Sequence, residues 1–147
     1  MENLFADYKT AKLLKEIGFD EECIDTFSAS SKKSMFEFTK SFGIYKNSKS
    51  TYSPSDKDLP QYISRPTYQQ VKEWLYKKHK IFISVNKVAV KKYHAFFETK
   101  DENKIPVWNE KKDKFLTRKM YYDSPLVVEI ECIEAAVIYL YNLKNKK

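Results

Sequence analysis

A length of 147 residues suits a single domain, residues 1–147, with room for one hydrophobic core and not for two. Hydrophobic residues make up 42% of the chain and charged residues 32%, which excludes a wholly disordered protein. The net charge of +7 is unevenly placed, because residues 1–60 carry 9 Lys and Arg against 10 Asp and Glu, and residues 61–147 carry 18 against 10. This excess favours an anionic partner such as a phosphate, a nucleotide or a nucleic acid.

The type of basic residue leaves a second explanation open. Only two of the 27 cations are arginines, Arg65 and Arg118. Arginine binds bases and phosphates through two parallel hydrogen bonds, whereas lysine is a less specific point charge. The scarcity of arginine therefore favours the second explanation, in which lysine fills solvent-exposed positions because the genome is rich in A and T.

Cysteine use and apolar runs indicate the compartment. Cys23 and Cys132 are far apart and belong to no CxxC pair, so we expect reduced thiols packed as small apolar groups. The first residues contain no basic segment followed by a long apolar one, so no secretory signal is expected. The longest apolar run, Ala135–Tyr141, is too short to cross a bilayer. A cytoplasmic protein with no membrane partner is the expectation.

The first part of the chain predicts one helix and two short strands. Asp7 suits the cap of a helix that runs to about Ile17, and Gly18 follows where a left-handed residue commonly ends a helix. Cys23–Phe27 has the composition of a strand. Met35–Phe38 predicts a second strand, because its phenylalanines alternate with polar residues.

The middle of the chain predicts a loop and then a helix. Residues 46–61 are rich in Asn, Ser, Thr, Pro and Asp, which predicts a long mobile loop of the kind that often closes over a site. Pro66 and Thr67 then open a helix over about Tyr68–Lys78, whose apolar residues recur at helical spacing.

Strands and a last helix follow. The strands are expected at Ile81–Val85, Val88–Glu98, Ile105–Trp108 and Phe115–Tyr122. Ser124 as N-cap and Pro125 at the first helical position open the helix, and residues 143–147 form a basic tail. The expected core face of this last helix consists of Leu126, Ile130, Ile133, Val137 and Leu140. The element order predicts the α+β class, with one antiparallel sheet of about five to six strands packed against two to three helices.

The sequence contains no recognisable catalytic motif. Its only glycines, Gly18 and Gly43, exclude a Walker-type phosphate loop, a dinucleotide-binding turn and a nucleophile elbow. The two histidines, His79 and His94, have no partners at zinc-ligand spacing. Cys132 lies in an apolar helix, where burial would raise the pKa of its thiol. Binding is therefore favoured over catalysis, with no catalytic residue, metal or cofactor expected.

Lys72–Lys92 is the most basic segment, with seven lysines and a single acid, Glu73. Trp74, Tyr76 and Phe82 lie among these lysines, which suits a base stacked on a ring while a lysine holds its phosphate. The alternative is that the rings belong to the core and the lysines are solvated, which is the commoner situation for Trp74 and Phe82.

The helix start at Arg65–Gln70 contains most of the candidate site residues. It places an arginine, a hydroxyl, a phenol and two amides at an electropositive helix end with free N–H groups. The alternative is that Thr67 caps the helix, Tyr68 packs inside and the glutamines face water. The full set of candidate ligand-binding residues is Arg65, Thr67, Tyr68, Gln69, Lys72, Trp108 and Arg118.

Three segments together resemble a known group of proteins. They are Asp7-Tyr8 with Leu14-Lys15-Glu16, Gly18-Phe19-Asp20-Glu21 and Cys23; Pro66-Thr67-Tyr68-Gln69-Gln70 with Trp74 and Lys77-Lys78-His79; and Glu131-Cys132 with Ala135-Ala136. In this order they resemble small uncharacterised accessory proteins of tailed phages and prophages that carry a PTYQQ…W…K helix. The middle segment is the most specific of the three. Residues 46–61 and 100–119 depart from the pattern of the group, which has no catalytic residues to transfer.

The resemblance implies a bacterial host cytoplasm. Non-catalytic phage proteins include binders of nucleotide immune signals, usually homo-oligomers with shared pockets. We therefore expect a non-enzymatic anti-defence protein that sequesters a nucleotide-derived signal. The phosphate of this signal would bind Arg65, Lys72 and Arg118. Its base would stack on Tyr68 and Trp108, and Gln69 would bind the edge of the base. The alternative is a phage accessory protein that binds nucleic acid or a host protein.

Overall fold

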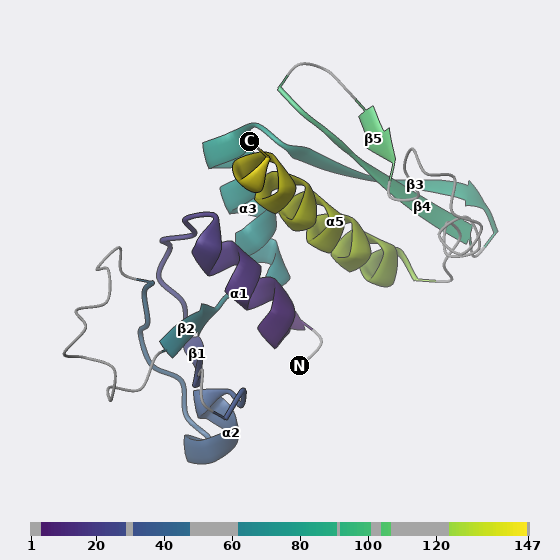
Figure 1. The fold of residues 1–147 in the computed structure, drawn as a ribbon. Coiled ribbons are helices and arrows are strands. Elements are labelled where there is room, and N and C mark those ends of the chain that lie inside the picture. The colour runs from purple at the N-terminus through teal and green to yellow at the C-terminus, as the bar shows by residue number, and fades with distance from the viewer. Residues whose placement is uncertain are drawn as a thin grey trace. The chain divides into compact units, whose positions relative to one another are not determined.

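The computed structural model describes residues 4–28, 31–47, 62–90, 92–100, 104–106 and 124–146. The chain divides into two compact units, Met1–Gln70 with Lys144–Lys147, and Val71–Leu143. The expectation of a single domain stays a prediction, since each unit is described by itself. In chain order the elements are α1 Tyr8–Glu16, β1 Asp25–Ser28, α2 Met35–Thr39, β2 Tyr62–Arg65, α3 Tyr68–His79, β3 Phe82–Ala89, β4 Lys92–Glu98, β5 Lys104–Pro106 and α5 Pro125–Asn145 (Figure 1).

The predicted α+β class is confirmed, but the predicted single sheet is wrong for the part of the chain that the structure describes. Its strands form two antiparallel sheets, β1–β2 in the first unit and β3–β4–β5 in the second. The difference begins in the first third of the chain. The strand predicted at Met35–Phe38 is a helix, and the strand predicted at Cys23–Phe27 begins two residues later, at Asp25.

α1 begins and ends as its sequence predicts. Asp7 Oδ1 accepts a hydrogen bond from the backbone N–H three residues on, at 2.7 Å. At the other end Gly18 has a φ of +96°, and the N–H groups of Gly18 and Phe19 donate to the carbonyls of Lys15 and Leu14 at 3.2 and 2.9 Å. This pair of bonds is the Schellman motif. Phe19 consequently turns back into the core and is 1% exposed.

Met35–Thr39 forms the short helix α2, so the strand predicted at Met35–Phe38 is wrong. Ser34 Oγ accepts a hydrogen bond from the Glu37 N–H at 3.3 Å and caps the helix. Lys40 ends it with a φ of 57°, in the left-handed region. Apolar residues two apart in so short a segment fit one helical turn as well as a strand, and the caps decide.

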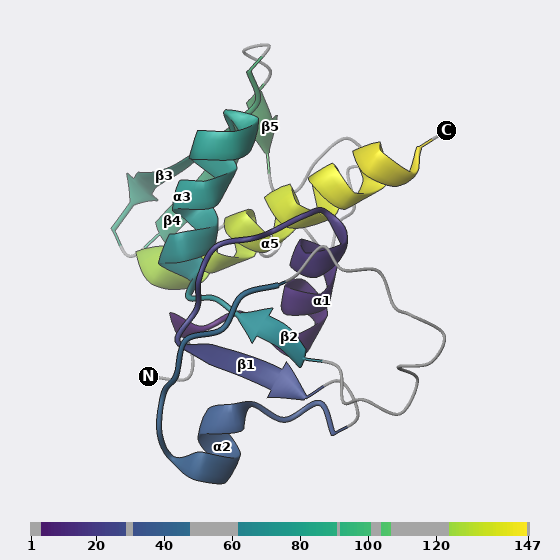
Figure 2. The same cartoon turned by 90° about the vertical axis from the view of Figure 1, so that its left-hand side faces the viewer.

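The β1–β2 ribbon has two different faces. Phe27 lies opposite Ile63, and on the alternate face Thr26 lies opposite Ser64. Phe27 and Ile63 are buried and pack against Ala11 of α1. Figure 2 shows the ribbon with α1 on one side and α2 on the other. The Thr26 and Ser64 face is therefore not the one that packs against α1.

β1 begins two residues later than the predicted strand Cys23–Phe27. Cys23 forms an isolated bridge with Tyr45 instead, and both backbone hydrogen bonds of this bridge measure 2.7 Å. The apolar pattern of the segment does not distinguish a ladder with β2 from a bridge to another segment, so the start of β1 was predicted incorrectly.

The second unit has a three-stranded sheet, and the helix α5 contacts one of its faces. Ile83 of β3 lies opposite Phe97 of β4, and both are buried. The Phe97 ring lies 5.4 Å from the Tyr139 ring of α5, which places α5 against this face. The predicted apolar face of α3 is confirmed, since Val71, Trp74 and Leu75 are at most 2% exposed.

Two boundaries in this sheet differ from the prediction. β3 continues to Ala89 and β4 begins at Lys92, so the break predicted between Val85 and Val88 lies further along the chain. β5 is Lys104–Pro106 and so begins one residue before the strand expected at Ile105–Trp108, of which residues 107 and 108 lie outside the described part of the chain. The strand predicted at Phe115–Tyr122 lies outside the described residues.

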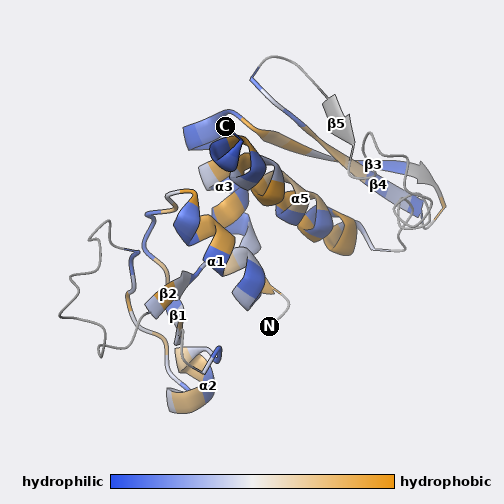
Figure 3. Cartoon of the chain, in the orientation of Figure 1, coloured by the Kyte–Doolittle hydropathy of each residue, from blue (hydrophilic) through white to orange (hydrophobic). Residues whose placement is uncertain are grey.

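α5 starts where the sequence predicts, and its predicted core face is buried only in part, at Ile133 and Val137. Ser124 Oγ accepts a hydrogen bond from the Val127 N–H at 3.4 Å, and the helix includes residues 143–145 of the predicted tail. Leu126, expected in the core, is 46% exposed. The buried residues are Val128, Cys132, Ile133, Ala136 and Val137. Hydrophobic residues recur along α5 up to its polar C-terminal turns (Figure 3), so their spacing allows more than one core face.

Both cysteines are buried and unpaired, as predicted. Burial raises the pKa of the Cys132 thiol from 9.0 to about 12, with Glu129 adding to the effect. Burial likewise raises the pKa of Cys23 to about 12, aided by Glu21. These shifts keep both thiols protonated at neutral pH, so neither is a ready nucleophile.

The raised pKa of Cys132 predicts a dependence of stability on pH. The unfolded thiol ionises near pH 9.0 and the folded one only near pH 12, so the stabilisation is complete below pH 9.0 and is lost as the pH rises toward 12. We expect the unfolding free energy of Cys132→Ala to fall less steeply above pH 9.0 than that of the wild type, as measured by urea denaturation. Equal slopes for the two proteins would contradict the assignment.

Candidate functional site

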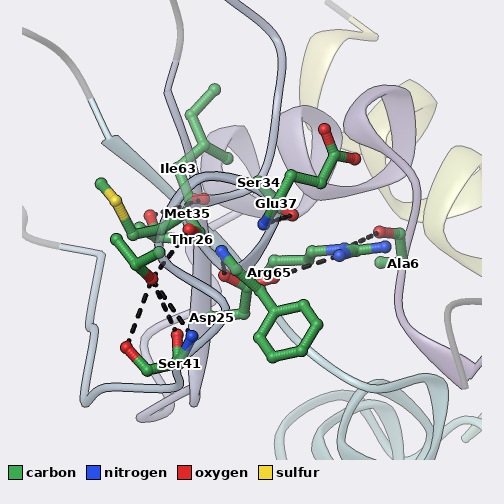
Figure 4. A network of polar contacts seen from close by, with 11 residues as sticks. Ala6, Asp25, Thr26, Ser34, Met35, Glu37, Ser41, Ile63 and Arg65 are labelled. Carbon is green, nitrogen blue, oxygen red and sulfur yellow. Dashed lines mark hydrogen bonds and ion pairs between the residues drawn. The ribbon is translucent and has the colours of Figure 1, made fainter.

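Arg65, the arginine of the predicted site, is buried inside the first unit. Its Nη1 lies 3.1 Å from Asp25 Oδ2, and its Nε donates to the Ala6 carbonyl at 3.3 Å (Figure 4). Its guanidinium also lies over the rings of Phe5 and Phe27, 5.0 and 5.1 Å from their centroids. With its charge neutralised and its plane covered by rings, Arg65 has a structural role here and not that of a free phosphate ligand.

Asp25 joins Arg65 to the helix α2. Its second carboxylate oxygen, Oδ1, accepts a hydrogen bond from the Phe36 N–H at 3.0 Å. Phe36 stacks on Phe42 with 4.4 Å between ring centroids, and Phe42 stacks on Phe5 at 6.0 Å. The Asp25 side chain, only 1% exposed, therefore holds β1, β2 and α2 together.

The start of α3 is closed by its own side chains. Thr67 Oγ1 accepts from the Gln70 N–H at 3.2 Å, and Gln70 Oε1 accepts from the Thr67 N–H at 3.1 Å. This reciprocal pair is a capping box, the pattern that Thr67-Tyr68-Gln69-Gln70 encodes. Gln70 Nε2 also donates to the Glu22 carbonyl at 2.8 Å. Tyr68 is 7% exposed and Gln69 is exposed, so this segment follows the structural alternative at Thr67 and Tyr68.

Of the other predicted site residues, Lys72 alone lies within the part of the chain that the structure describes. Lys72 Nζ lies 3.3 Å from Glu129 Oε2 of α5, which neutralises its charge within the second unit. Trp108 and Arg118 lie outside the described residues, so their part in a site stays a prediction.

A cavity of about 360 Å³ lies on the Thr26 and Ser64 face of the ribbon. Thr26 and Ser64 are 1% and 3% exposed and contribute two buried side-chain hydroxyls. Tyr62, two residues before Ser64 in β2, falls on the same face. The complete described lining is Thr26, Met35, Ile44, Tyr45, Lys46, Tyr62 and Ser64.

Backbone and amide contacts position Tyr45 and Lys46 beside the cavity. The Cys23 bridge holds Tyr45 from one side. Asn47 holds the chain from the other, since its Oδ1 accepts from the Ser64 N–H at 3.1 Å and its Nδ2 donates to the Phe19 carbonyl at 3.2 Å. The two side chains are therefore placed by an ordered part of the first unit.

Gly43 makes room for the Tyr45 ring. A Cβ at this position would lie 2.9 Å from the Tyr45 hydroxyl and 3.0 Å from two ring carbons, closer than van der Waals contact allows. Any larger residue would have to displace the ring. Gly43 therefore allows the Tyr45 ring to occupy its place beside the cavity.

The chemistry of the lining suits an anionic ligand with an apolar or ring portion. Lys46 supplies a positive charge, and no acidic residue is among the described lining residues. Two phenols and two buried hydroxyls supply hydrogen-bonding groups, while Met35 and Ile44 supply apolar surface. The volume lies at the lower end of the range for small-molecule sites.

Sequence reasoning missed this site because its residues come from four separate segments. The one available signal was position, since the cavity residues flank the predicted loop at 46–61. Whether this loop closes over the cavity concerns residues 48–61, outside the described part of the chain.

Within the described residues, no group of His, Cys, Asp or Glu side chains could hold a metal ion. The same residues include no helix long and apolar enough to cross a membrane. Comparisons with protein-family models, curated proteins and solved structures find no match to this chain. Its function must therefore be argued from its own residues.

Proposed function

We propose that the protein is a non-enzymatic binding protein for an anionic, nucleotide-derived small molecule, and that the cavity of the first unit is its site. The observation that carries the proposal is the lining, which combines one ammonium group, two tyrosines and two buried hydroxyls with no described acid. The phage resemblance adds the biological part of the proposal, sequestration of a host immune signal by a homo-oligomer.

Each side chain of the cavity has a distinct role in this proposal. Lys46 neutralises a phosphate through a charge-assisted hydrogen bond, a contact that contributes about 1.5 to 3 kcal/mol. Tyr62, 46% exposed, offers its ring to a base. Thr26 Oγ1 donates to the Ile63 carbonyl at 3.0 Å, which leaves the hydroxyl as an acceptor for a ligand N–H or O–H. Ser64 supplies a second buried hydroxyl.

Thermal denaturation with a panel of mononucleotides, cyclic dinucleotides and ADP-ribose derivatives tests the proposal. A ligand at 100 times its Kd should stabilise the native protein by about 2.7 kcal/mol and raise its Tm. Lys46→Gln should weaken binding by about 10-fold or more, since it removes the phosphate contact. Lys12→Gln, at an exposed lysine of α1, is the matched control and should bind normally.

Gly43→Ala adds a variant that keeps every lining residue. The new methyl group forces the Tyr45 ring to move, so binding should weaken while the fold is retained. The absence of any thermal shift across the panel would count against the proposal, as would equal effects of Lys46→Gln and Lys12→Gln. Recovery of the ligand unchanged after incubation separates a binding protein from an enzyme.

A further inference from the structure

Two aromatic rings of the second unit are exposed next to each other. Tyr76, on the last turns of α3, is 57% exposed, and Phe82, the first residue of β3, is 53% exposed. Their centroids are 6.4 Å apart with the rings at 72°. Phe82 follows the buried Ile81 and precedes the buried Ile83, so strand alternation turns it away from the core. Large rings exposed in contact with one another indicate a surface that binds a partner.

Lysines surround this aromatic pair. Lys80 Nζ lies over the Tyr76 ring, 5.7 Å from its centroid, and donates to the Lys77 carbonyl at 3.3 Å. Lys77 and Lys78 are exposed on the same last turn of the helix. The side chains of Tyr76, Lys77, Lys78, Lys80 and Phe82 are called the Tyr76–Phe82 surface below.

The end of α3 places Lys80 at this position. Lys80 adopts a φ of 54°, and its N–H donates to the Tyr76 carbonyl at 3.1 Å. This is the αL motif that usually carries glycine. Because Lys80 is four residues after Tyr76, its side chain reaches back over the ring. The helix end thus holds a cation against an exposed aromatic face.

The neighbouring charges are mixed and limit the strength of any anion contact. Glu73 lies one turn before Tyr76 on α3, and Glu98 lies opposite Phe82 on β4. The pKa of His79 is lowered by burial and by Lys78, which keeps the imidazole neutral at physiological pH. Three lysines therefore supply the positive charge, and binding through them must be weak and sensitive to salt.

We propose that the Tyr76–Phe82 surface binds single-stranded nucleic acid. The rings stack on unpaired bases, and Lys77, Lys78 and Lys80 contact the phosphates. Stacking on aromatic side chains next to basic residues is how proteins bind single strands without sequence preference. Duplex nucleic acid hides its base faces, so the exposed rings favour a single strand over a duplex. The proposal concerns a different unit from the cavity and does not depend on the proposed ligand.

Fluorescence anisotropy with a labelled oligothymidylate, and with a duplex of equal length, tests the proposal on the full chain. We expect preferential binding of the single strand, with log K falling against log salt at a slope of about −2 for three lysine contacts. Phe82→Ala and Tyr76→Ala should each weaken binding by about 5- to 100-fold, the loss of one stacked base. Lys77→Gln combined with Lys80→Gln should reduce the slope by about 1.4.

Matched variants in the first unit serve as controls. Phe38→Ala removes an exposed ring of α2 that does not line the cavity, and Lys9→Gln with Lys12→Gln removes two exposed lysines of α1. Each of these proteins should bind the single strand as the wild type does. Circular dichroism checks that the Tyr76 and Phe82 variants keep the fold, and Tyr76→Phe should keep most of the affinity because it retains the ring.

Three results would overturn the proposal. The first is no binding of the single strand at low salt. The second is equal affinity for single strand and duplex with no effect of the ring variants, which would show a general attraction to lysines. The third is a host protein whose capture depends on Tyr76 and Phe82 while the oligonucleotide does not bind, because the surface would then serve a protein partner.

Discussion

Asp25→Ala is expected to lower the unfolding free energy by about 3 to 5 kcal/mol, because it leaves the buried guanidinium of Arg65 without its counter-charge. The two groups are 3.1 Å apart with side chains 1% and 10% exposed, so water cannot replace the lost carboxylate. The substitution also removes the acceptor of the Phe36 N–H at the start of α2. Urea denaturation followed by circular dichroism measures the change.

A second ion pair provides the control for Asp25. Lys72 and Glu129 are 3.3 Å apart with side chains 32% and 27% exposed, so Glu129→Ala should cost about 1 kcal/mol or less. The double variant Asp25→Ala with Arg65→Leu should be less destabilised than the sum of its single variants, since it leaves no unpaired charge. Similar losses for Asp25→Ala and Glu129→Ala would contradict the structural role of Arg65. That outcome would return Arg65 to the set of free ligand-binding cations.

Phe97→Ala is expected to lower the unfolding free energy by about 3 to 5 kcal/mol, the usual cost of emptying a large aromatic site in a core. Phe97 is 2% exposed, lies opposite Ile83 in the sheet and contacts the Tyr139 ring of α5. Its loss therefore opens a void between the sheet and the helix. Denaturation curves for the variant and the wild type measure the difference.

Phe82 offers a matched control in the same sheet. It is a phenylalanine of β3 on the opposite face of the sheet from Phe97 and is 53% exposed, so Phe82→Ala should cost about 1 kcal/mol or less. The two substitutions remove the same atoms and differ in burial. A large loss for Phe82→Ala would mean that this ring belongs to the core, and would contradict the proposed nucleic-acid surface as well.

The scarcity of glycine explains part of what the sequence could not predict. Lys32, Lys40 and Lys80 all occupy the left-handed region, with φ between 54° and 58°. Lysine is not a residue that marks turns, so the end of α2 at Lys40 could not be predicted from the sequence pattern. At Gly18, where the usual residue is present, the end of α1 was predicted correctly.

The predicted site illustrates a motif with a structural explanation. Thr67 and Gln70 form a capping box, a role that their spacing alone encodes. The partner of Arg65 is 40 residues away, so its burial could not be anticipated from the same segment. The cavity residues Tyr45 and Tyr62 come together through two backbone pairings. Cys23 pairs with Tyr45, and β1 pairs with β2, which contains Tyr62.

Local signals determined much of this protein from the sequence alone. Caps and helical spacing predicted α1, α3 and the start of α5, because each depends on residues within a few positions of one another. Tertiary structure alone decided which residues of α5 are buried, that α2 lies beside β1, and that the strands form two sheets. Those outcomes depend on contacts between distant segments, whose free energies exceed the small differences in local propensity. The cavity and the exposed rings of Tyr76 and Phe82 belong to the same class, since exposure is a property of the folded chain.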